Sequence, residues 1–246
     1  MINIVIPMAG AGSRFSAEGY VKPKPFIDVN GKPMIVRVLE NLAHPKARFI
    51  LVARKEHIDA EDQLVKQIEE EFNAIFLPID KLTEGSACTI LYARKYINNE
   101  NPLLIANSDQ IVDIDIVTFI DDCVNRQLDG SILTFIDEAR DPKWSFAKID
   151  ADGIVTEVQE KKAISEFATV GIYLYKRGRD FVDAAVDMFI QAERINNEYY
   201  TCPTYNYAIR NGLTFGIYNI DVKTMHGIGT PADLQTYLKL FHSNTD

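Results

Sequence analysis

The segment Ile2–Arg14, with the sequence INIVIPMAGAGSR, joins a short apolar run to a loop that contains two glycines. The apolar run is rich in β-branched residues and is followed at once by a proline, which predicts a buried strand. Gly10 and Gly12 let the backbone come close to a ligand and turn its N–H groups towards it. Arg14 and Lys24 add positive charge beside this loop, so the segment predicts a polyphosphate site.

Two widespread nucleotide-binding motifs do not fit the same segment. The two glycines match the first positions of the G-x-G-x-x-G dinucleotide motif, but Phe15 stands where the third glycine belongs. The Gly31-Lys32 pair is followed by Pro33, where a Walker loop has serine or threonine. Taken alone, the segment also fits an ordinary strand-to-helix turn with two solvated cations, and this alternative stays open.

Strand and helix patterns alternate through the first half of the chain. Apolar residues at helical spacing predict helices at 64–72 and 87–97. Short apolar runs predict strands at 48–53, 74–78 and 102–106 and, beyond Gly130, at 131–136, 146–149, 154–158 and 169–175. Repeated β-α units imply a parallel sheet with helices on both faces and ligands at the C-terminal strand ends. The later strands make this sheet mixed, and residues 150–153 predict a hairpin turn between two of them.

Size and composition are those of a globular enzyme, and we predict a single domain over 1–246. The chain is 47% hydrophobic and 25% charged, and its net charge of −9 argues against general binding to nucleic acid. Three cysteines form no C-x-x-C pair, which indicates reduced thiols without a zinc site. No apolar run approaches a membrane span and the N-terminus lacks the form of a signal peptide, so we expect a cytoplasmic protein without a membrane partner.

Asp109 follows the strand predicted at 102–106, at the same sheet edge as the glycine loop. A carboxylate beside a phosphate site is suited to Mg²⁺, which prefers carboxylate and phosphate oxygens. By itself the pattern favours a turn or capping aspartate, which is common after strands.

Several motifs stand in register near the N-terminus. They are Ala9-Gly10-Ala11-Gly12-Ser13-Arg14, Pro23-Lys24-Pro25 and Gly31-Lys32-Pro33-Met34-Ile35, after the first predicted strand. In order and spacing they resemble those of the sugar-phosphate nucleotidyltransferases, also called nucleotide-sugar pyrophosphorylases. The resemblance implies a Rossmann-like three-layer α/β/α sandwich with a mostly parallel, mixed central sheet of the nucleotide-diphospho-sugar transferase type. It also implies a nucleotide-binding half over 1–130 and an acceptor-binding half over 131–246.

The resemblance assigns roles to individual residues. It places the nucleotide at Met8, Ala9, Gly10, Gly12, Ser13 and Gly85. It gives catalysis to Arg14 at the leaving pyrophosphate, to Lys24 between donor and acceptor phosphates, and to Asp109 as the ligand of Mg²⁺. It places the acceptor at Glu160, Lys161, Gly171 and Glu198.

The residues alone leave simpler alternatives open for the weaker matches. Gly85 fits a plain helix N-terminus, Gly171 fits a β-bulge, and Glu198 fits the surface. The Glu160-Lys161 pair fits a solvated charge cluster. The aromatic residues in the run 197–203, Tyr199 and Tyr200, fit either core packing or a contact in a homo-oligomer.

Two positions depart from the family's pattern. Lys162 stands where the family usually has proline, which raises the question whether Lys161 or Lys162 points inward, and we favour Lys161. In the D-x-G-T motif near the C-terminus, Gly227 replaces the aspartate that serves as a second metal ligand. Either Asp109 holds the metal with phosphates and water as the other ligands, or another group such as Asp221 or His226 helps, although imidazole suits softer metals than Mg²⁺.

Together with these residues, the resemblance implies an enzyme that transfers a nucleoside monophosphate from an NTP to a sugar 1-phosphate and releases pyrophosphate. Its expected partners are these two substrates, with Mg²⁺ as cofactor. Three alternatives remain: a metal-dependent glycosyltransferase on a related fold, transfer to a phospho-alcohol or phospho-amine, and a catalytically silent nucleotide-binding module. A glycosyltransferase has no departing pyrophosphate and hence little use for both Arg14 and Lys24.

Overall fold

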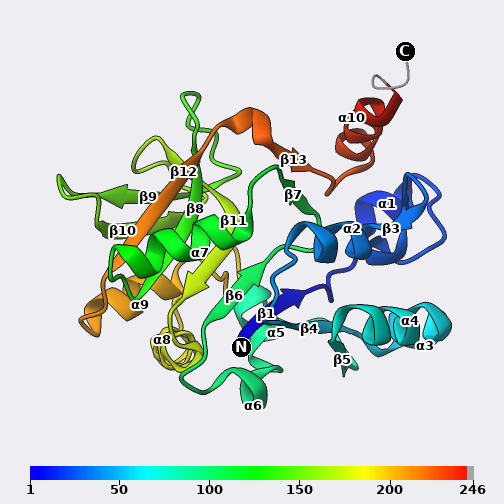
Figure 1. Ribbon diagram of the computed structural model, residues 1–246, viewed down its shortest axis with the longest axis horizontal. Coiled ribbons are helices and arrows are strands. Elements are labelled where there is room, and N and C mark those ends of the chain that lie inside the picture. The colour runs from blue at the N-terminus through cyan, green and yellow to red at the C-terminus, as the bar shows by residue number, and fades with distance from the viewer. Residues whose placement is uncertain (243–246) are drawn as a thin grey trace.

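The computed structural model describes residues 1–242, and within them nine strands form one mixed sheet (Figure 1). The longest path across the sheet has the order β10-β9-β11-β6-β1-β4-β5, and β8 and β12 join it beside β11. The strands are β1 (Ile2–Pro7), β4 (Ala47–Arg54), β5 (Ala74–Ile79), β6 (Leu103–Ala106), β8 (Gly130–Ile136), β9 (Ser145–Ile149), β10 (Val155–Glu160), β11 (Phe167–Tyr175) and β12 (Phe215–Ile220).

Most strands of this sheet run in one direction. β1 pairs in parallel with both β4 and β6, and parallel pairing also joins β4 to β5 and β8 to β12. β11 runs against β6, β8 and β9, and β10 runs against β9. The prediction of a mostly parallel, mixed central sheet is therefore confirmed.

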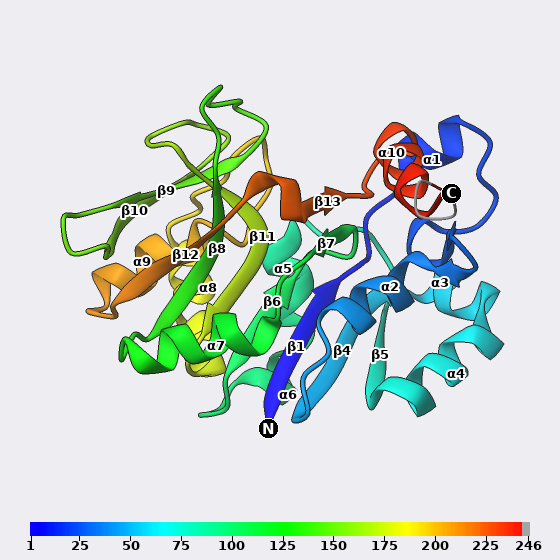
Figure 2. The same ribbon diagram turned by 45° about the horizontal axis from the view of Figure 1, so that its top comes forward.

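Helices cover both faces of the sheet, which confirms the predicted three-layer sandwich. Along β1, Ile4 and Ile6 belong to one hydrophobic cluster and Val5 to the other, as the two-residue period of a strand requires. Figure 2 shows α2 and α7 on one face, with α5 and α8 behind. The first cluster takes side chains from α1 (Ser13–Ala17), α2 (Met34–Asn41), α4 (Asp62–Phe72), α7 (Ile116–Asn125) and α10 (Pro231–His242). The second takes them from α5 (Ser86–Leu91), α6 (Arg94–Ile97), α8 (Gly178–Ile190) and α9 (Thr204–Arg210).

Several short elements lie outside the main sheet, near the C-terminal ends of its parallel strands. β2 (Asp28–Val29) and β3 (Lys32–Pro33) form a small hairpin, and α3 (Lys55–Ala60) follows β4 directly. η1 (Lys24–Phe26) is a turn of 3₁₀ helix, as is η2 (Val222–Thr224). β7 (Gln110–Val112) pairs antiparallel with β13 (Met225–Gly227), so the chain beyond β12 returns to the residues that follow β6.

The strands and helices predicted from sequence agree with the structure except at one helix. The helix predicted at 87–97 is divided into α5 and α6, because the N–H groups of Tyr92 and Ala93 bond to carbonyls three residues back. Asp115 caps α7, and its side chain accepts a hydrogen bond of 2.9 Å from the Val117 N–H. β12 and α9 have no counterpart among the predicted strands and helices. No helix within residues 1–242 has the length and apolar character needed to cross a membrane.

Candidate active site

The thirteen residues predicted for the site line two adjoining cavities at the C-terminal edge of β1 and β6. The cavities share Pro7, Gly10, Ala11, Ser86 and Asn107 on their walls. The smaller, of 430 Å³, is lined by Met8, Gly10, Gly12, Ser13, Arg14, Lys24 and Asp109. The larger, of 590 Å³, is lined by Ala9, Gly10, Gly85, Glu160, Lys161, Gly171 and Glu198.

The loop after β1 brings Lys24 to the smaller cavity. Gly12 has φ +63°, a left-handed conformation that favours glycine, and a Cβ there would lie 3.2 Å from the Cβ of Lys24. The loop and the start of η1 therefore pack closely. Arg14, on α1, is exposed at the rim of the same cavity.

Lys24 and Asp109 form an ion pair on the wall of the smaller cavity. The Lys24 ammonium donates to Asp109 Oδ2, and the two side chains are 20% and 27% exposed. Gly229 lies against the same carboxylate, since a Cβ at this position would be 2.6 Å from Asp109 Oδ2. The backbone N–H of Ile228 also donates to the Asp109 carbonyl at 2.9 Å. The return of the chain through β13 thus packs around Asp109.

Asp109 offers the type of donor that Mg²⁺ prefers, although it stands alone. It is the one acidic side chain among the described residues that line the smaller cavity. Residues 1–242 contain no cluster of three or more His, Cys, Asp or Glu side chains able to hold a metal. A divalent ion at Asp109 would therefore take its other ligands from substrate phosphates and water.

Asp221 and His226, considered as replacements for the missing second carboxylate, both contact other residues than Asp109. Asp221 caps η2 and accepts a hydrogen bond of 2.9 Å from the Lys223 N–H. The His226 Nε2 atom lies 2.7 Å from Asp113 Oδ2. Both side chains are outside the two cavities.

Gly85 joins the turn before α5 to the segment before α9. Gly85 has φ +117°, and a Cβ there would lie 2.4 Å from the Tyr199 carbonyl oxygen. The Tyr199 N–H donates to the Glu84 carbonyl at 2.7 Å, and the Ala87 N–H donates to the Tyr199 carbonyl at 3.0 Å. Only glycine permits this contact. Gly85 thus does more than begin a helix.

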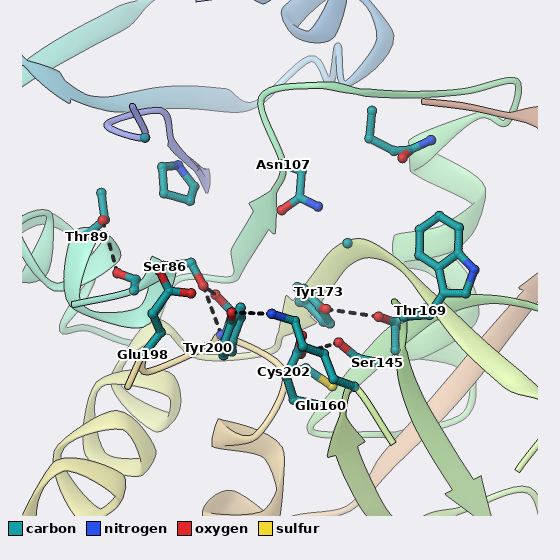
Figure 3. Close-up of a pocket in the computed structure, with 18 of the residues that line it drawn as sticks. Ser86, Thr89, Asn107, Ser145, Glu160, Thr169, Tyr173, Glu198, Tyr200 and Cys202 are labelled. Carbon is teal, nitrogen blue, oxygen red and sulfur yellow. Dashed lines mark hydrogen bonds between the residues drawn. The ribbon is translucent and has the colours of Figure 1, made fainter. Parts of the chain in front are cut away.

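Glu160 is a buried carboxylate on the wall of the larger cavity, beside Ser145 (Figure 3). It ends β10 opposite Ser145 of β9, whose hydroxyl donates to Glu160 Oε2. Burial raises the pKa of the Glu160 carboxyl, and the Ser145 hydrogen bond and the Lys161 charge oppose this effect in part. A carboxylate held this way can accept further hydrogen bonds from a polar ligand.

Lys161 projects its ammonium into the same cavity. Its backbone is left-handed, with φ +54°, and its N–H donates to the Trp144 carbonyl at 3.0 Å. Lys161 Nζ donates to the Tyr200 hydroxyl at 2.6 Å, which raises the pKa of Lys161 and keeps it charged. The neighbouring Lys162 is exposed and lines neither cavity. Glu198 is exposed at the cavity edge, near Tyr200 in Figure 3.

Gly171 makes room for a protein side chain. It has φ +91° and lies within a register shift between Thr169 and Tyr173 of β11. A Cβ at Gly171 would lie 2.1 Å from Asn107 Nδ2, and the Asn107 N–H donates to the Gly171 carbonyl at 3.1 Å. The β-bulge interpretation thus describes the local backbone, and the Asn107 amide occupies the space beside the glycine.

The sequence patterns did not predict the contacts that three of the cavity residues make. Asn107 stands two residues before Asp109, and its place just after a buried strand was the available signal. Ser145 and Tyr200 contact Glu160 and Lys161 through the folded chain, and nothing in their local sequence indicates these contacts.

Comparison with known proteins shows what this chain is similar to. The family model described as Nucleotidyl transferase matches residues 4–203. A mannose-1-phosphate guanyltransferase of Aspergillus oryzae is 28% identical over 114 residues, which are 46% of this chain and 31% of that protein. The bifunctional protein GlmU of Methanocaldococcus jannaschii is 22% identical over 179 residues, 72% of this chain and 40% of that protein. The chain thus spans less than half the length of either relative.

A solved structure has the same fold over nearly its whole length. The nucleoside-diphosphate-sugar pyrophosphorylase from Vibrio cholerae RC9 superposes with a TM-score of 0.80, covering 96% of this chain and 99% of that chain at 24% identity. At this identity the likeness establishes the shared architecture.

Proposed function

The chain belongs to the nucleotidyl transferase family, and from this premise we propose that it transfers a nucleoside monophosphate from an NTP to a sugar 1-phosphate, releasing pyrophosphate. The observation that carries the proposal is the pair of adjoining cavities. Arg14, Lys24 and Asp109 line one, and Glu160 and Lys161 line the other. A triphosphate in the first and an anionic acceptor in the second would meet at the shared wall.

The chemistry needs positioning and charge neutralisation more than a catalytic base. An acceptor phosphate oxygen, already anionic, attacks the α-phosphorus of the NTP as the bond to the β-phosphate oxygen breaks. We assign to Lys24, on the wall of the smaller cavity, the neutralisation of negative charge between the two phosphate groups, and to Arg14 the stabilisation of the departing pyrophosphate. Lys161 holds the acceptor phosphate, and Glu160 accepts hydrogen bonds from its sugar hydroxyls.

Asp109 is the protein ligand we assign to Mg²⁺. Bound magnesium supplies charge neutralisation for the α-phosphate and the leaving group. An ion held by Asp109 would compete with Lys24 for this carboxylate and would leave the Lys24 ammonium available to phosphate oxygens.

The test is a pyrophosphate-release assay across the four common NTPs with a panel of sugar 1-phosphates in the presence of Mg²⁺. The proposal expects acceptor-dependent release with at least one pair, and a nucleotide-sugar as the second product by mass spectrometry. NTP binding without turnover of any acceptor would instead favour a catalytically silent module.

One observation favours a phospho-amine as a second candidate acceptor. Trp144 lines the larger cavity together with the carboxylates Glu160 and Glu198, and aromatic faces with nearby carboxylates attract organic cations. The Lys143 ammonium, however, already lies 5.0 Å from the centre of the Trp144 ring, and the Lys161 ammonium lies 4.6 Å from the centre of the Tyr200 ring, so both aromatic rings already contact a cation of the protein. Phosphocholine and phosphoethanolamine in the same assay separate this candidate from the sugar phosphates.

A further inference from the structure

The two lysines of the site are held by partners of different charge. Lys24 contacts the carboxylate of Asp109, which cancels its charge locally. Lys161 contacts the hydroxyl of Tyr200, which is neutral and holds the ammonium in place without cancelling its charge. Its contact partner thus leaves the Lys161 charge uncancelled, and the carboxylates of Glu160 and Glu198 act on it only through the field across the cavity.

Tyr200 limits the conformations open to the Lys161 side chain. A lysine side chain has four rotatable bonds, and fixing its end costs conformational entropy that a ligand otherwise has to supply. The 2.6 Å hydrogen bond to the hydroxyl and the 4.6 Å approach to the ring engage the ammonium at two points. The left-handed backbone of Lys161 and its bond to the Trp144 carbonyl restrict the other end of the residue.

The segment that carries Tyr200 is attached to the turn at Gly85. The Ser86 Oγ atom lies 2.8 Å from Thr201 Oγ1 and accepts a hydrogen bond of 3.0 Å from the Thr201 N–H. Together with the bonds of Tyr199 to Glu84 and Ala87, four contacts join the two segments around Gly85. Figure 3 shows Ser86 and Tyr200 on the same side of the cavity.

We propose that Tyr200 is a positioning residue, which holds the Lys161 ammonium where the acceptor's anionic group binds. Through the hydrogen bonds of its neighbours Tyr199 and Thr201, it also connects Lys161 to the turn at Gly85. The inference rests on the proposed function and extends it to a residue that does not touch the reacting atoms. The turn at Gly85, which we assign to the nucleotide, and the Lys161 ammonium, which we assign to the acceptor, are then joined by one network of hydrogen bonds.

The test compares Tyr200→Phe with the wild type in steady-state kinetics with the sugar 1-phosphate and NTP that the wild type uses best. The variant keeps the ring and loses the hydroxyl, and we expect the acceptor KM to rise about tenfold, the effect of one hydrogen bond to a charged group. We expect kcat to change less than threefold, and the NTP dissociation constant without acceptor to stay within twofold. Tyr218→Phe, on β12 and outside both cavities, is the matched control.

The results separate this inference from the proposed function. If the wild-type protein transfers no nucleotide to any acceptor, both the proposed function and the role of Tyr200 are refuted. A working wild type whose acceptor KM is unchanged in Tyr200→Phe overturns the role of Tyr200 alone. Thermal denaturation checks that the variant is folded, and a KM effect in an equally stable variant excludes a merely structural role.

A double-mutant cycle tests the connection to the turn. Thr201→Val removes the hydroxyl that contacts Ser86, and we expect it to raise the acceptor KM about threefold. If Thr201 acts through Tyr200, the double variant has about the tenfold effect of Tyr200→Phe alone. Independent effects, which multiply to about thirtyfold, would contradict the connection.

Discussion

At the scale of the residue, the ion pair of Lys24 and Asp109 is the main charged feature on the wall of the smaller cavity. Both side chains are partly exposed to that cavity, and neither belongs to the hydrophobic clusters. Each can therefore be replaced without loss of core packing, which allows function to be tested apart from stability.

Lys24→Ala and Asp109→Ala are each expected to lower kcat/KM for nucleotide transfer at least about a hundredfold, because each removes charge stabilisation at the reacting phosphates. Circular dichroism and thermal denaturation should show a folded protein in both cases. Lys32→Ala is the control, since Lys32 pairs with Glu40 on the surface outside both cavities. A near-wild-type rate in Lys24→Ala would refute the role given to that residue.

Glu160 gives the stability of the fold a pH dependence with a defined sign. Burial raises its pKa in the folded state, so the folded protein binds the proton more tightly than the unfolded chain does. Glu160 thus lowers stability as the pH rises from its unfolded pKa, about 4.3, through its folded pKa.

Glu160→Gln removes this titration. The melting temperature of the variant, relative to the wild type, is expected to increase between pH 4 and pH 7.5, as measured by differential scanning calorimetry. Asp152→Asn, in the exposed turn between β9 and β10, is the control. A difference between variant and wild type that is constant across this range would contradict the raised pKa.

Prediction of site residues from sequence depended on how local their signals are. Lys24 and Asp109 stand in short motifs with glycine or proline neighbours or just after a strand, so they could be named before the structure. Tyr200 meets Lys161 across 39 positions, a contact that only the folded chain creates. The roles of all these residues stay predictions until tested.

At the scale of the element, the turn before α5 depends on a glycine with no room for a side chain. Gly85→Ala places a Cβ against the Tyr199 carbonyl and a side chain at positive φ, so we expect a loss of stability of about 1–3 kcal/mol or more. The acceptor KM should also rise, because Tyr200 moves with Tyr199. Urea denaturation and kinetics measure the two effects.

Gly212→Ala is the matched control for that substitution. Gly212 has φ +85°, but a Cβ there meets nothing within 4 Å, so the variant reports backbone strain alone, about 1–2 kcal/mol. If the two substitutions lower the free energy of unfolding equally, the contact with Tyr199 adds nothing to the destabilisation by Gly85→Ala.

Prediction of the elements succeeded where burial on both faces makes a strand apolar throughout. The runs that became β1, β4 and β6 are of this kind, since the central strands are covered by helices on both sides. β12 pairs along its length with β8 and makes a single further bridge, from Gly216 to Ile154, and its apolar residues are broken by Gly216 and Asn219. Its strand conformation depends on a partner more than eighty residues earlier in the chain.

At the scale of the whole molecule, an acidic protein has to bind a polyanion. The net charge is −9, yet Arg14, Lys24 and Lys161 all line the two cavities. Binding energy is therefore expected to come from this local concentration of cations, and only the folded chain assembles it.

An NTP with Mg²⁺ should consequently stabilise the fold. At a ligand concentration of 100 times the dissociation constant the gain is about 2.7 kcal/mol. For a chain of this length that gain raises the melting temperature by about 5–10 °C. Differential scanning fluorimetry with each of the four NTPs measures it, with the matching nucleosides, which lack phosphates, as controls. Equal shifts for a nucleoside and its triphosphate would contradict a phosphate-binding cavity.

The contact between Gly229 and the Asp109 carboxylate has a consequence for biosynthesis. Strands β1, β4, β5 and β6 have all left the ribosome long before Gly229 is translated, and N-terminal segments begin to fold during synthesis. The wall around Asp109 is nevertheless complete only when β13 has paired with β7. A nascent chain therefore builds most of its sheet before it acquires a finished pocket for the metal ligand.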